Sequence, residues 1–271
     1  TTDDPLWTEE HTVSVSPSTV ETLAKCPLRW VVERHGGQDP AELASITGTL
    51  VHALAQAAAT GADERQLRAR LDEAWAAVDA GAPWFSRRER IRVERMLDTF
   101  LTWLASSRSQ LTQVAVEEDI SVDIPPQDGG PKLRVRGRVD RLETDRDGRP
   151  VVVDVKTGKT PVSKNDAQQH PQLAVYQLAS ALGGFTHLGL ATDPGGARLL
   201  YVAKEDKKTG AVEREQAPLD EQGVRVWLEA VQLAAGSSVG PSYQATENAD
   251  CDRCPARTTC PVHSSGRQVS Q

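Results

Sequence analysis

Two acidic residues and a lysine form the pattern in this chain that points most clearly to chemistry. Asp140 closes the run Arg-Gly-Arg-Val-Asp, and Asp154 and Lys156 close the run Val-Val-Val-Asp-Val-Lys. A turn sequence, Asp-Arg-Asp-Gly-Arg at 145–149, separates the two runs and predicts a hairpin. A hairpin centred on Asp147 places Asp140 directly across from Asp154, with Cβ atoms about 4.5–5.5 Å apart. Lys156 then projects from the same face as Asp154, because alternate residues of a strand share a face.

This arrangement suits the hydrolysis of a phosphodiester bond. Two carboxylates this close repel each other, and a divalent cation that takes oxygen ligands removes the repulsion. The cation would also polarise the phosphate and activate a water, which Lys156 would orient or deprotonate. The alternative is a structural ion pair between Lys156 and Asp154, which is the more common role of an isolated Asp-x-Lys sequence.

Two further pairs of residues have the spacing of neighbours on one helix face. Gly48 and His52 are four residues apart, and so are Gln172 and Tyr176. Each pair alone is weak evidence, since a lone histidine or a Gln/Tyr pair on a helix more often meets a neighbouring helix or solvent than a ligand.

The four cysteines gather at the two ends of the chain. Cys26 lies near the start, and Cys251-x2-Cys254-x5-Cys260 lies near the end. In an intracellular chain this pattern indicates a metal or redox site more often than disulfides. Four thiolates fit either zinc or an iron–sulfur cluster, and His263 is a possible replacement for one of them. Either metal would tie the first helix to the tail of the chain.

Composition and charge exclude several other classes of protein. The chain has 271 residues and a net charge of −7, which argues against a protein that coats DNA through a general positive charge. Residues 131–170 nevertheless hold ten Lys and Arg against six Asp and Glu, which suggests either an anionic substrate there or arginines on the solvated face of a strand pair. No apolar run is long enough to span a membrane, and no secretory signal opens the chain. Gly158-Lys159-Thr160 imitates a nucleotide-binding loop, but Val153 stands where that loop needs glycine.

The elements expected to position these residues form an α/β fold, with a central mixed β-sheet flanked by helices. Hydrophobic periodicity and capping signals predict helices over 17–34, 41–60, 63–80, 86–110, 166–182 and 219–235. Alternating or continuous apolar runs predict strands over 114–124, 133–142, 151–156, 187–191 and 197–203. Strict alternation along 133–142 places Val139 and Arg141 on one face and Asp140 and Leu142 on the other. The expected organisation is a linker or arm at 1–13, one domain at 14–262 that includes a helical insertion at 41–110, and a flexible tail at 263–271.

In this order, the motifs resemble those of the RecB-like branch of the PD-(D/E)xK nuclease superfamily. The matching signs are Gly48…His52, Gly137-x-x-Asp140, Asp154-x-Lys156 and Gln172-x3-Tyr176. The cysteine spacing resembles the iron–sulfur staple of AddB-type nuclease domains and of the CRISPR-adaptation exonucleases. The resemblance spans residues 14–262 and implies a restriction-endonuclease-like fold.

The resemblance also implies a role for each matching residue. Mg²⁺ or Mn²⁺ would be bound by His52, Asp140, Asp154 and the Val155 carbonyl, with Lys156 as the catalytic lysine. Gln172 and Tyr176 would line the DNA path and support the site, and Glu117 is a candidate for an acid outside the direct ligands. A [4Fe–4S] cluster with a structural role, preferred on this ground over zinc, would be bound by Cys26, Cys251, Cys254 and Cys260.

We therefore expect a cytoplasmic, divalent-metal-dependent deoxyribonuclease that acts as an exonuclease on single-stranded DNA ends. The resemblance favours the nuclease domain of a bacterial double-strand-break repair helicase–nuclease of the AddB or AdnAB kind. Its helicase motor would precede residue 1 or belong to a partner subunit, and the absence of an initiating methionine agrees with a domain of a longer chain. The alternatives are a free-standing CRISPR-adaptation exonuclease and a non-catalytic DNA-binding or assembly module.

Overall fold

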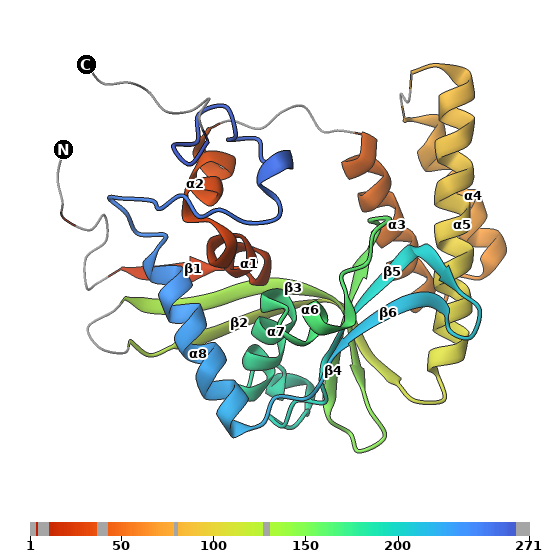
Figure 1. Cartoon of the computed structure of the whole chain (residues 1–271). Helices are drawn as coiled ribbons and strands as arrows, with labels where there is room; N and C mark the ends of the chain where they lie inside the picture. Colours follow the sequence, from red (N-terminus) through yellow and green to blue (C-terminus); the bar gives the residue numbers. More distant parts are fainter. Residues whose placement is uncertain (1–3, 5–10, 37–42, 79–80, 127–130, 264–271) are drawn as a thin grey trace.

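The computed structural model describes residues 4, 11–36, 43–78, 81–126 and 131–263, and in this part of the chain a six-stranded mixed sheet forms the centre (Figure 1). Its strands are β1 (Thr12–Val15), β2 (Thr112–Ile124), β3 (Lys132–Thr144), β4 (Pro150–Lys156), β5 (Ala197–Asp206) and β6 (Gly210–Gln216). β4 and β5 are parallel, whereas β2–β3, β3–β4 and β5–β6 are antiparallel pairs. The mixed sheet flanked by helices that the sequence predicts is confirmed.

The long strand β3 is the branch point of this sheet. β2 follows one edge of β3, while the other edge pairs first with β1, up to Val135, and then with β4, from Arg141 onward. Helix α1 (Pro17–Lys25) begins beside the stretch between these two partners. A Cβ atom on Gly137 would lie 2.9 Å from Cδ of Pro17, so only glycine lets the helix approach this closely. Asp140 lies immediately before the point where β4 joins.

Helices cover both faces of the sheet (Figure 1). On one face α1, α7 (Pro171–Ala181) and α8 (Glu221–Gly236) contribute to one hydrophobic core. On the other face α3 (Leu43–Ala59), α4 (Glu64–Ala76) and α5 (Pro83–Ser107) contribute to a second core. In β4, Val152 lies in the first core and Val151 and Val153 in the second, which explains why that strand is apolar without alternation.

Two predicted helices are each divided in two at a proline. The helix expected over 17–34 is interrupted at Cys26, so that α1 is followed by α2 (Pro27–His35). The helix expected over 166–182 is divided into α6 (Lys164–Gln168) and α7 at the His170–Pro171 step. Proline cannot donate the backbone hydrogen bond that continues a helix, and it disfavours the helical conformation of the residue before it.

The strand expected over 187–191 was wrong, and two strands were not foreseen. Residues Thr186–Leu188 form a short 3₁₀ helix that ends at Gly189, whose φ of 77° lies in the left-handed region. β6 was not predicted, because its charged sequence lacks an apolar alternation. β1 begins at Thr12, inside the segment assigned to an arm; residues 1–3 and 5–10 of that arm and residues 264–271 of the tail lie outside the described residues.

The hairpin register predicted around Asp147 is confirmed, since Arg141 pairs with Val153 and Leu142 with Val152. The strict alternation predicted along β3, in contrast, is wrong between Val139 and Leu142. Val139 and Leu142 lie in the same core, so the pleat is interrupted between them and Arg141 turns to the opposite face.

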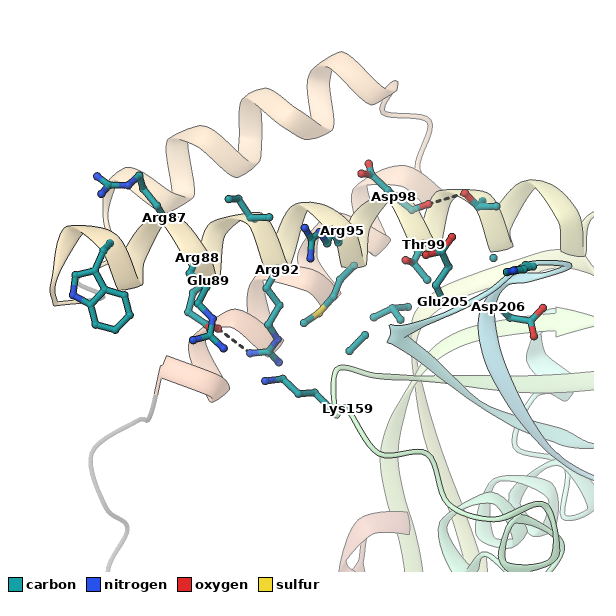
Figure 2. A pocket seen from close by; sticks show the side chains of 18 residues that line it. Arg87, Arg88, Glu89, Arg92, Arg95, Asp98, Thr99, Lys159, Glu205 and Asp206 are labelled. Atoms are coloured by element: carbon teal, nitrogen blue, oxygen red, sulfur yellow. Dashed lines mark hydrogen bonds and ion pairs between the residues drawn. The ribbon is translucent and has the colours of Figure 1, made fainter.

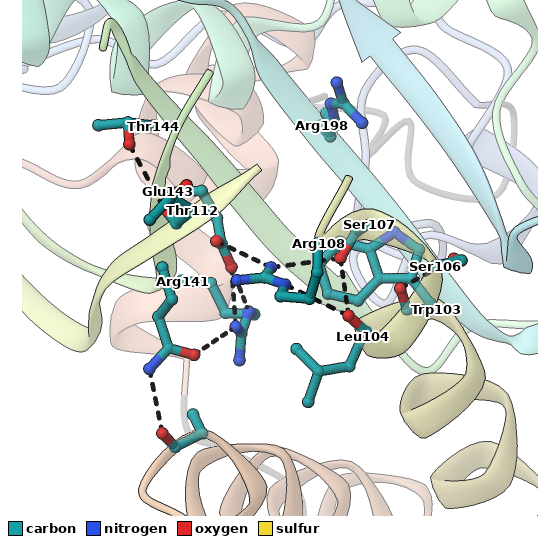
Figure 3. A network of polar contacts seen from close by, with 12 residues as sticks. Trp103, Leu104, Ser106, Ser107, Arg108, Thr112, Arg141, Glu143, Thr144 and Arg198 are labelled. Atoms are coloured by element: carbon teal, nitrogen blue, oxygen red, sulfur yellow. Dashed lines mark hydrogen bonds and ion pairs between the residues drawn. The ribbon is translucent and has the colours of Figure 1, made fainter. Parts of the chain in front are cut away.

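Arg141 is therefore not on the face of Val139, as expected, but beneath α5. Its guanidinium lies over the rings of Phe100 and Trp103 and donates to Glu143, which also accepts from Arg108 (Figure 3). This buried ion network attaches the end of α5 to the sheet.

Part of the basic segment at 131–170 is neutralised by acids of the sheet and of the β3–β4 turn. Arg134 pairs with Asp123, Arg138 with Asp119 at 2.8 Å, and Arg149 with Asp145 at 2.8 Å. These pairs favour the interpretation of a solvated strand face over that of an anion site for these three arginines. No helix in the described residues combines the length and hydrophobicity needed to cross a membrane.

Candidate active site

His52 and Asp140 meet at the branch point of the sheet. His52 extends from α3, and its Nδ1 atom lies 3.3 Å from Oδ1 of Asp140. The other carboxylate oxygen of Asp140 accepts the backbone N–H of Val155 at 2.6 Å. The β3–β4 pairing ends at Arg141 and Val153, so the Val155 N–H is available to bond the Asp140 side chain. This hydrogen bond fixes the carboxylate between α3 and the end of β4.

Glu117 completes a compact group with these two residues. The pairs Val116–Arg141 and Glu118–Val139 flank it, so that Glu117 lies across β2–β3 from Asp140. Its φ of 51° is in the left-handed region, which is uncommon for a residue other than glycine and is often found at functional sites. One ligand atom each from His52, Glu117 and Asp140 lie within 4.8 Å of one another, close enough to hold a metal ion.

Asp154 is the centre of a second, buried group beside the first. It is 5% exposed, and its Oδ1 atom accepts from Gln172 Nε2 at 2.8 Å and from the Tyr176 hydroxyl at 3.1 Å. Lys156 Nζ lies 2.8 Å from Asp154 Oδ2 and donates to Gln172 Oε1 at 2.8 Å. Gln172 and Tyr176, four residues apart on α7, thus face the end of β4 together.

The electrostatics of the site follow from burial and from these contacts. Burial raises the pKa of the Asp154 carboxyl, and the nearby Asp140 carboxylate acts in the same direction, against the effect of Lys156. Burial alone would lower the pKa of Lys156, but the Asp154 carboxylate outweighs it and raises that pKa. The hydrogen bond to Asp140 raises the pKa of His52. Burial raises the pKa of Tyr176, so its hydroxyl stays protonated and donates to Asp154.

A divalent cation fits the donors found here. Hard cations take carboxylate oxygens, and an imidazole can complete the set. Asp154 Oδ2 is buried and, despite its proximity to Lys156, lacks a hydrogen bond of ordinary geometry. A cation between the two groups would bind the three clustered ligand atoms. It would also satisfy this buried acceptor.

The structure therefore brings the sequence-predicted site residues to one region in two groups. His52 and Asp140 lie in one group, and Asp154, Lys156, Gln172 and Tyr176 lie in the other. The role of the Val155 carbonyl stays a prediction; the backbone N–H of Val155 connects the groups. Glu117, expected outside the direct ligands, lies among the clustered donors. The pairing of the predicted strands 114–124 and 133–142 was the signal that could have placed it there.

The four cysteines line one small cavity at the opposite end of α1 from the branch point. The cavity walls also include Arg29, Arg257 and His263. Cys26 Sγ accepts the backbone N–H groups of Arg29 and Thr246, each at 3.5 Å. Residues separated by 220 positions in the chain thus meet between α2 and the C-terminal tail, as Figure 1 shows.

Comparison with known proteins identifies the family. The family model of the PD-(D/E)XK nuclease superfamily matches residues 14–261. No curated protein matches the chain significantly. Among solved structures, the crystal structure of SSO0001 is similar at 17% identity, covering 93% of this chain and 88% of that chain, with a TM-score of 0.41, a value too low to add to the argument. The match over nearly the whole chain shows that this protein belongs to the PD-(D/E)XK nuclease superfamily, which implies a metal-dependent nuclease with DNA as its substrate.

Proposed function

We propose that the protein is an exonuclease that hydrolyses phosphodiester bonds at the ends of single-stranded DNA at the site formed by Asp140, Asp154 and Lys156. The observation that carries this proposal is the convergence at the end of β4 of a clustered ligand set with a buried Asp–Lys–Gln–Tyr network. A structural ion pair would need only Asp154 and Lys156. It would not explain why His52, Glu117 and Asp140 gather beside them.

Mg²⁺ or Mn²⁺ would be held by His52, Asp140 and Glu117, with Asp154 and the Val155 carbonyl as further ligands. When bound, the ion would neutralise charge on the scissile phosphate and lower the pKa of a coordinated water. Every other part of the site is supplied by the chain itself.

Lys156 acts as a cation in this proposal, because its raised pKa keeps it protonated near neutral pH. A protonated lysine orients the water and stabilises the charge that develops on the phosphate, but it does not accept the water's proton. Gln172 fixes the lysine and the carboxylate at once, since its amide accepts from Lys156 and donates to Asp154. Tyr176 fixes the same carboxylate from the helix turn above.

The test is cleavage of end-labelled linear single-stranded DNA with Mg²⁺ or Mn²⁺ by the wild type, Asp154→Ala and Lys156→Ala. We expect cleavage by the wild type and its loss in both variants, with circular dichroism confirming that they fold. Unchanged cleavage in both variants would refute the assignment of the site. A circular single strand of the same sequence serves as the control for end dependence, and its equal cleavage would contradict an exonuclease.

We also propose that Cys26, Cys251, Cys254 and Cys260 bind a [4Fe–4S] cluster. Their common cavity brings the four side chains together, and two backbone N–H groups donate to the Cys26 sulfur.

Anaerobic purification followed by iron, sulfide and zinc analysis tests the cluster. We expect iron and acid-labile sulfide in equal amounts, together with a brown colour that Cys254→Ser removes. A colourless protein with one zinc per chain would contradict the proposal.

The cysteine spacing, which resembles that of AddB-type nuclease domains, supports a place in a DNA-end-resecting helicase–nuclease, with a motor in the same natural polypeptide or in a partner subunit. The expected result is DNA-dependent ATPase and unwinding activity in the complete natural complex. A complete natural complex that degrades DNA without any ATP-dependent unwinding would contradict this role.

A further inference from the structure

A groove of about 990 Å³ lies between α5 and the β5–β6 hairpin, next to the catalytic end of β4 (Figure 2). One wall is formed by a single face of α5, which carries Arg87, Arg88 and Arg95. Lys159, from the loop after β4, and Lys207, from the hairpin turn, line it from the sheet side. The predicted site residues do not line this groove, and of the basic segment at 131–170 only Lys159 does.

The groove is positive although the chain is acidic. The side chains of the five basic residues just named have no hydrogen bond or ion pair with any described residue. Two of the four acids in the groove are ion-paired, Glu89 with Arg92 and Asp98 with Arg68 at 2.8 Å, while Glu205 and Asp206 lie at its hairpin end. Asp206 accepts backbone N–H groups of its own turn. A row of unpaired cations of this kind is the electrostatic pattern of a phosphate-binding surface.

The groove and the candidate active site adjoin the same loop, the one that follows Lys156. Arg92, on α5, donates to the carbonyl of Thr157 at 3.3 Å. On the other side of the same residue, a Cβ atom on Gly48 of α3 would lie 3.4 Å from Thr157 Oγ1. Lys159, which lines the groove, follows Lys156 by only three residues, so a strand that left the site past this loop would meet the groove at Lys159.

Exposed apolar side chains alternate with the cations along α5. Trp84 is 63% exposed, and Ile91, two turns further along the helix, is 47% exposed. An exposed tryptophan ring beside arginines, here packed edge-on against Phe85, offers a stacking platform to an unpaired base. A duplex would not use this platform, because its base faces are covered. The distance from Trp84 to Arg95 along the helix is about 16 Å, enough for a few nucleotides.

We propose that the α5 groove binds the single-stranded DNA that flanks the scissile phosphate, with phosphates on Arg87, Arg88, Arg95 and Lys159 and a base stacked on Trp84. This inference rests on the proposed function and specifies how that site receives its substrate. The groove sets the affinity for strands long enough to reach it and leaves the chemistry at Lys156 unchanged.

The test compares two triple variants with the same loss of charge. Arg87→Ala/Arg88→Ala/Arg95→Ala removes the α5 cations, and Arg65→Ala/Arg70→Ala/Arg225→Ala removes exposed arginines elsewhere. Binding of a fluorescent oligothymidylate is measured by anisotropy with Ca²⁺ in place of Mg²⁺, as a function of salt.

We expect the groove variant to bind at least about tenfold more weakly, with a salt slope smaller by about 2 because three phosphate contacts are lost. The control variant should bind like the wild type. Trp84→Ala should weaken the binding of single strands but not of duplexes, whereas Trp84→Phe should retain most of it. An equal loss in both triple variants, or no loss in the groove variant, would overturn the proposal. A loss confined to duplexes would overturn the single-stranded assignment.

Cleavage separates this inference from the proposed function. If the wild type binds strands through the groove but does not cleave them with Mn²⁺, the proposed function fails while the groove stands. If the wild type cleaves and the groove variant keeps the wild-type Kd and KM, the groove fails while the proposed function stands. The expected result is a raised KM with kcat within about threefold of the wild type.

Discussion

Replacing Lys156 with methionine separates the catalytic role of this residue from its structural role. Methionine keeps the length of the side chain but removes the cation that lies 2.8 Å from Asp154 Oδ2. In the proposed reaction that cation stabilises charge on the phosphate only as the reaction proceeds. Its loss should reduce kcat by about 10²–10³-fold, the usual cost of removing one aligned group of this kind.

The same substitution leaves the buried Asp154 carboxylate without its counterion. Breaking a buried pair costs about 3–5 kcal/mol of folding free energy. Two contacts reduce this cost, because Gln172 and Tyr176 still donate to the carboxylate. We therefore expect Lys156→Met to destabilise the protein by about 2 kcal/mol and to lower its Tm by roughly 4–8 °C.

The destabilisation should depend on pH in a definite direction. Burial already raises the pKa of Asp154, and the loss of Lys156 raises it further. An acid whose folded pKa exceeds its unfolded value, about 3.9, weakens the fold increasingly as the pH rises from that value to the folded pKa. Unfolding by urea should therefore show a larger difference between Lys156→Met and the wild type at pH 8 than at pH 5.

The double variant Asp154→Asn/Lys156→Met is the control. It removes both charges while the amide oxygen still accepts from Gln172 and Tyr176. Its stability should return to within about 1 kcal/mol of the wild type, and its activity should stay lost. If Lys156→Met cleaves within fivefold of the wild-type rate, or if the double variant regains activity together with stability, this reasoning is refuted.

Three further predictions concern the metal group and the branch point of the sheet. Glu117→Gln should raise the Mn²⁺ concentration needed for half-maximal cleavage at least tenfold, whereas the neighbouring Glu118→Gln should not; equal effects would contradict the ligand assignment. Asp140 raises the pKa of His52, so protons compete with the metal for this imidazole up to a higher pH than usual. The Mn²⁺ affinity measured by calorimetry should therefore fall as the pH drops through the pKa of His52. Affinity independent of pH between 5 and 8 would argue against a histidine ligand. Gly137→Ala should destabilise by about 1–3 kcal/mol in urea unfolding, because the added methyl group meets the proline that begins α1, whereas Gly236→Ala meets open space and should be neutral or stabilising.

The sequence was most informative where a short-range pattern dictates the geometry. The turn centred on Asp147 set the register of β3 and β4, and the four-residue spacing on α7 placed Gln172 and Tyr176 on one face toward the site. Both inferences need only the period of a strand or a helix.

Contacts that depend on tertiary packing could not be derived in the same way. The irregular pleat at Asp140 arises where β3 changes partners from β1 to β4, and no local signal marks that branch point. Glu117 joins Asp140 because β2 lies along β3 with a left-handed residue at that level. The groove on α5 depends on which arginines find acidic partners, and that follows only from the packed structure.

The most direct test of the central claim is a titration of single-stranded DNA cleavage with Mn²⁺, from metal-free protein upward, for the wild type and Asp140→Asn. Asp140 touches His52 and the backbone of Val155, so the variant keeps the shape of the site and changes its charge. We predict no cleavage without metal, saturable cleavage by the wild type, and at least a tenfold higher metal requirement or no activity in the variant. Absence of cleavage by folded wild-type protein at saturating Mn²⁺, or identical titrations for the two proteins, would contradict a metal-dependent nuclease centred on this site.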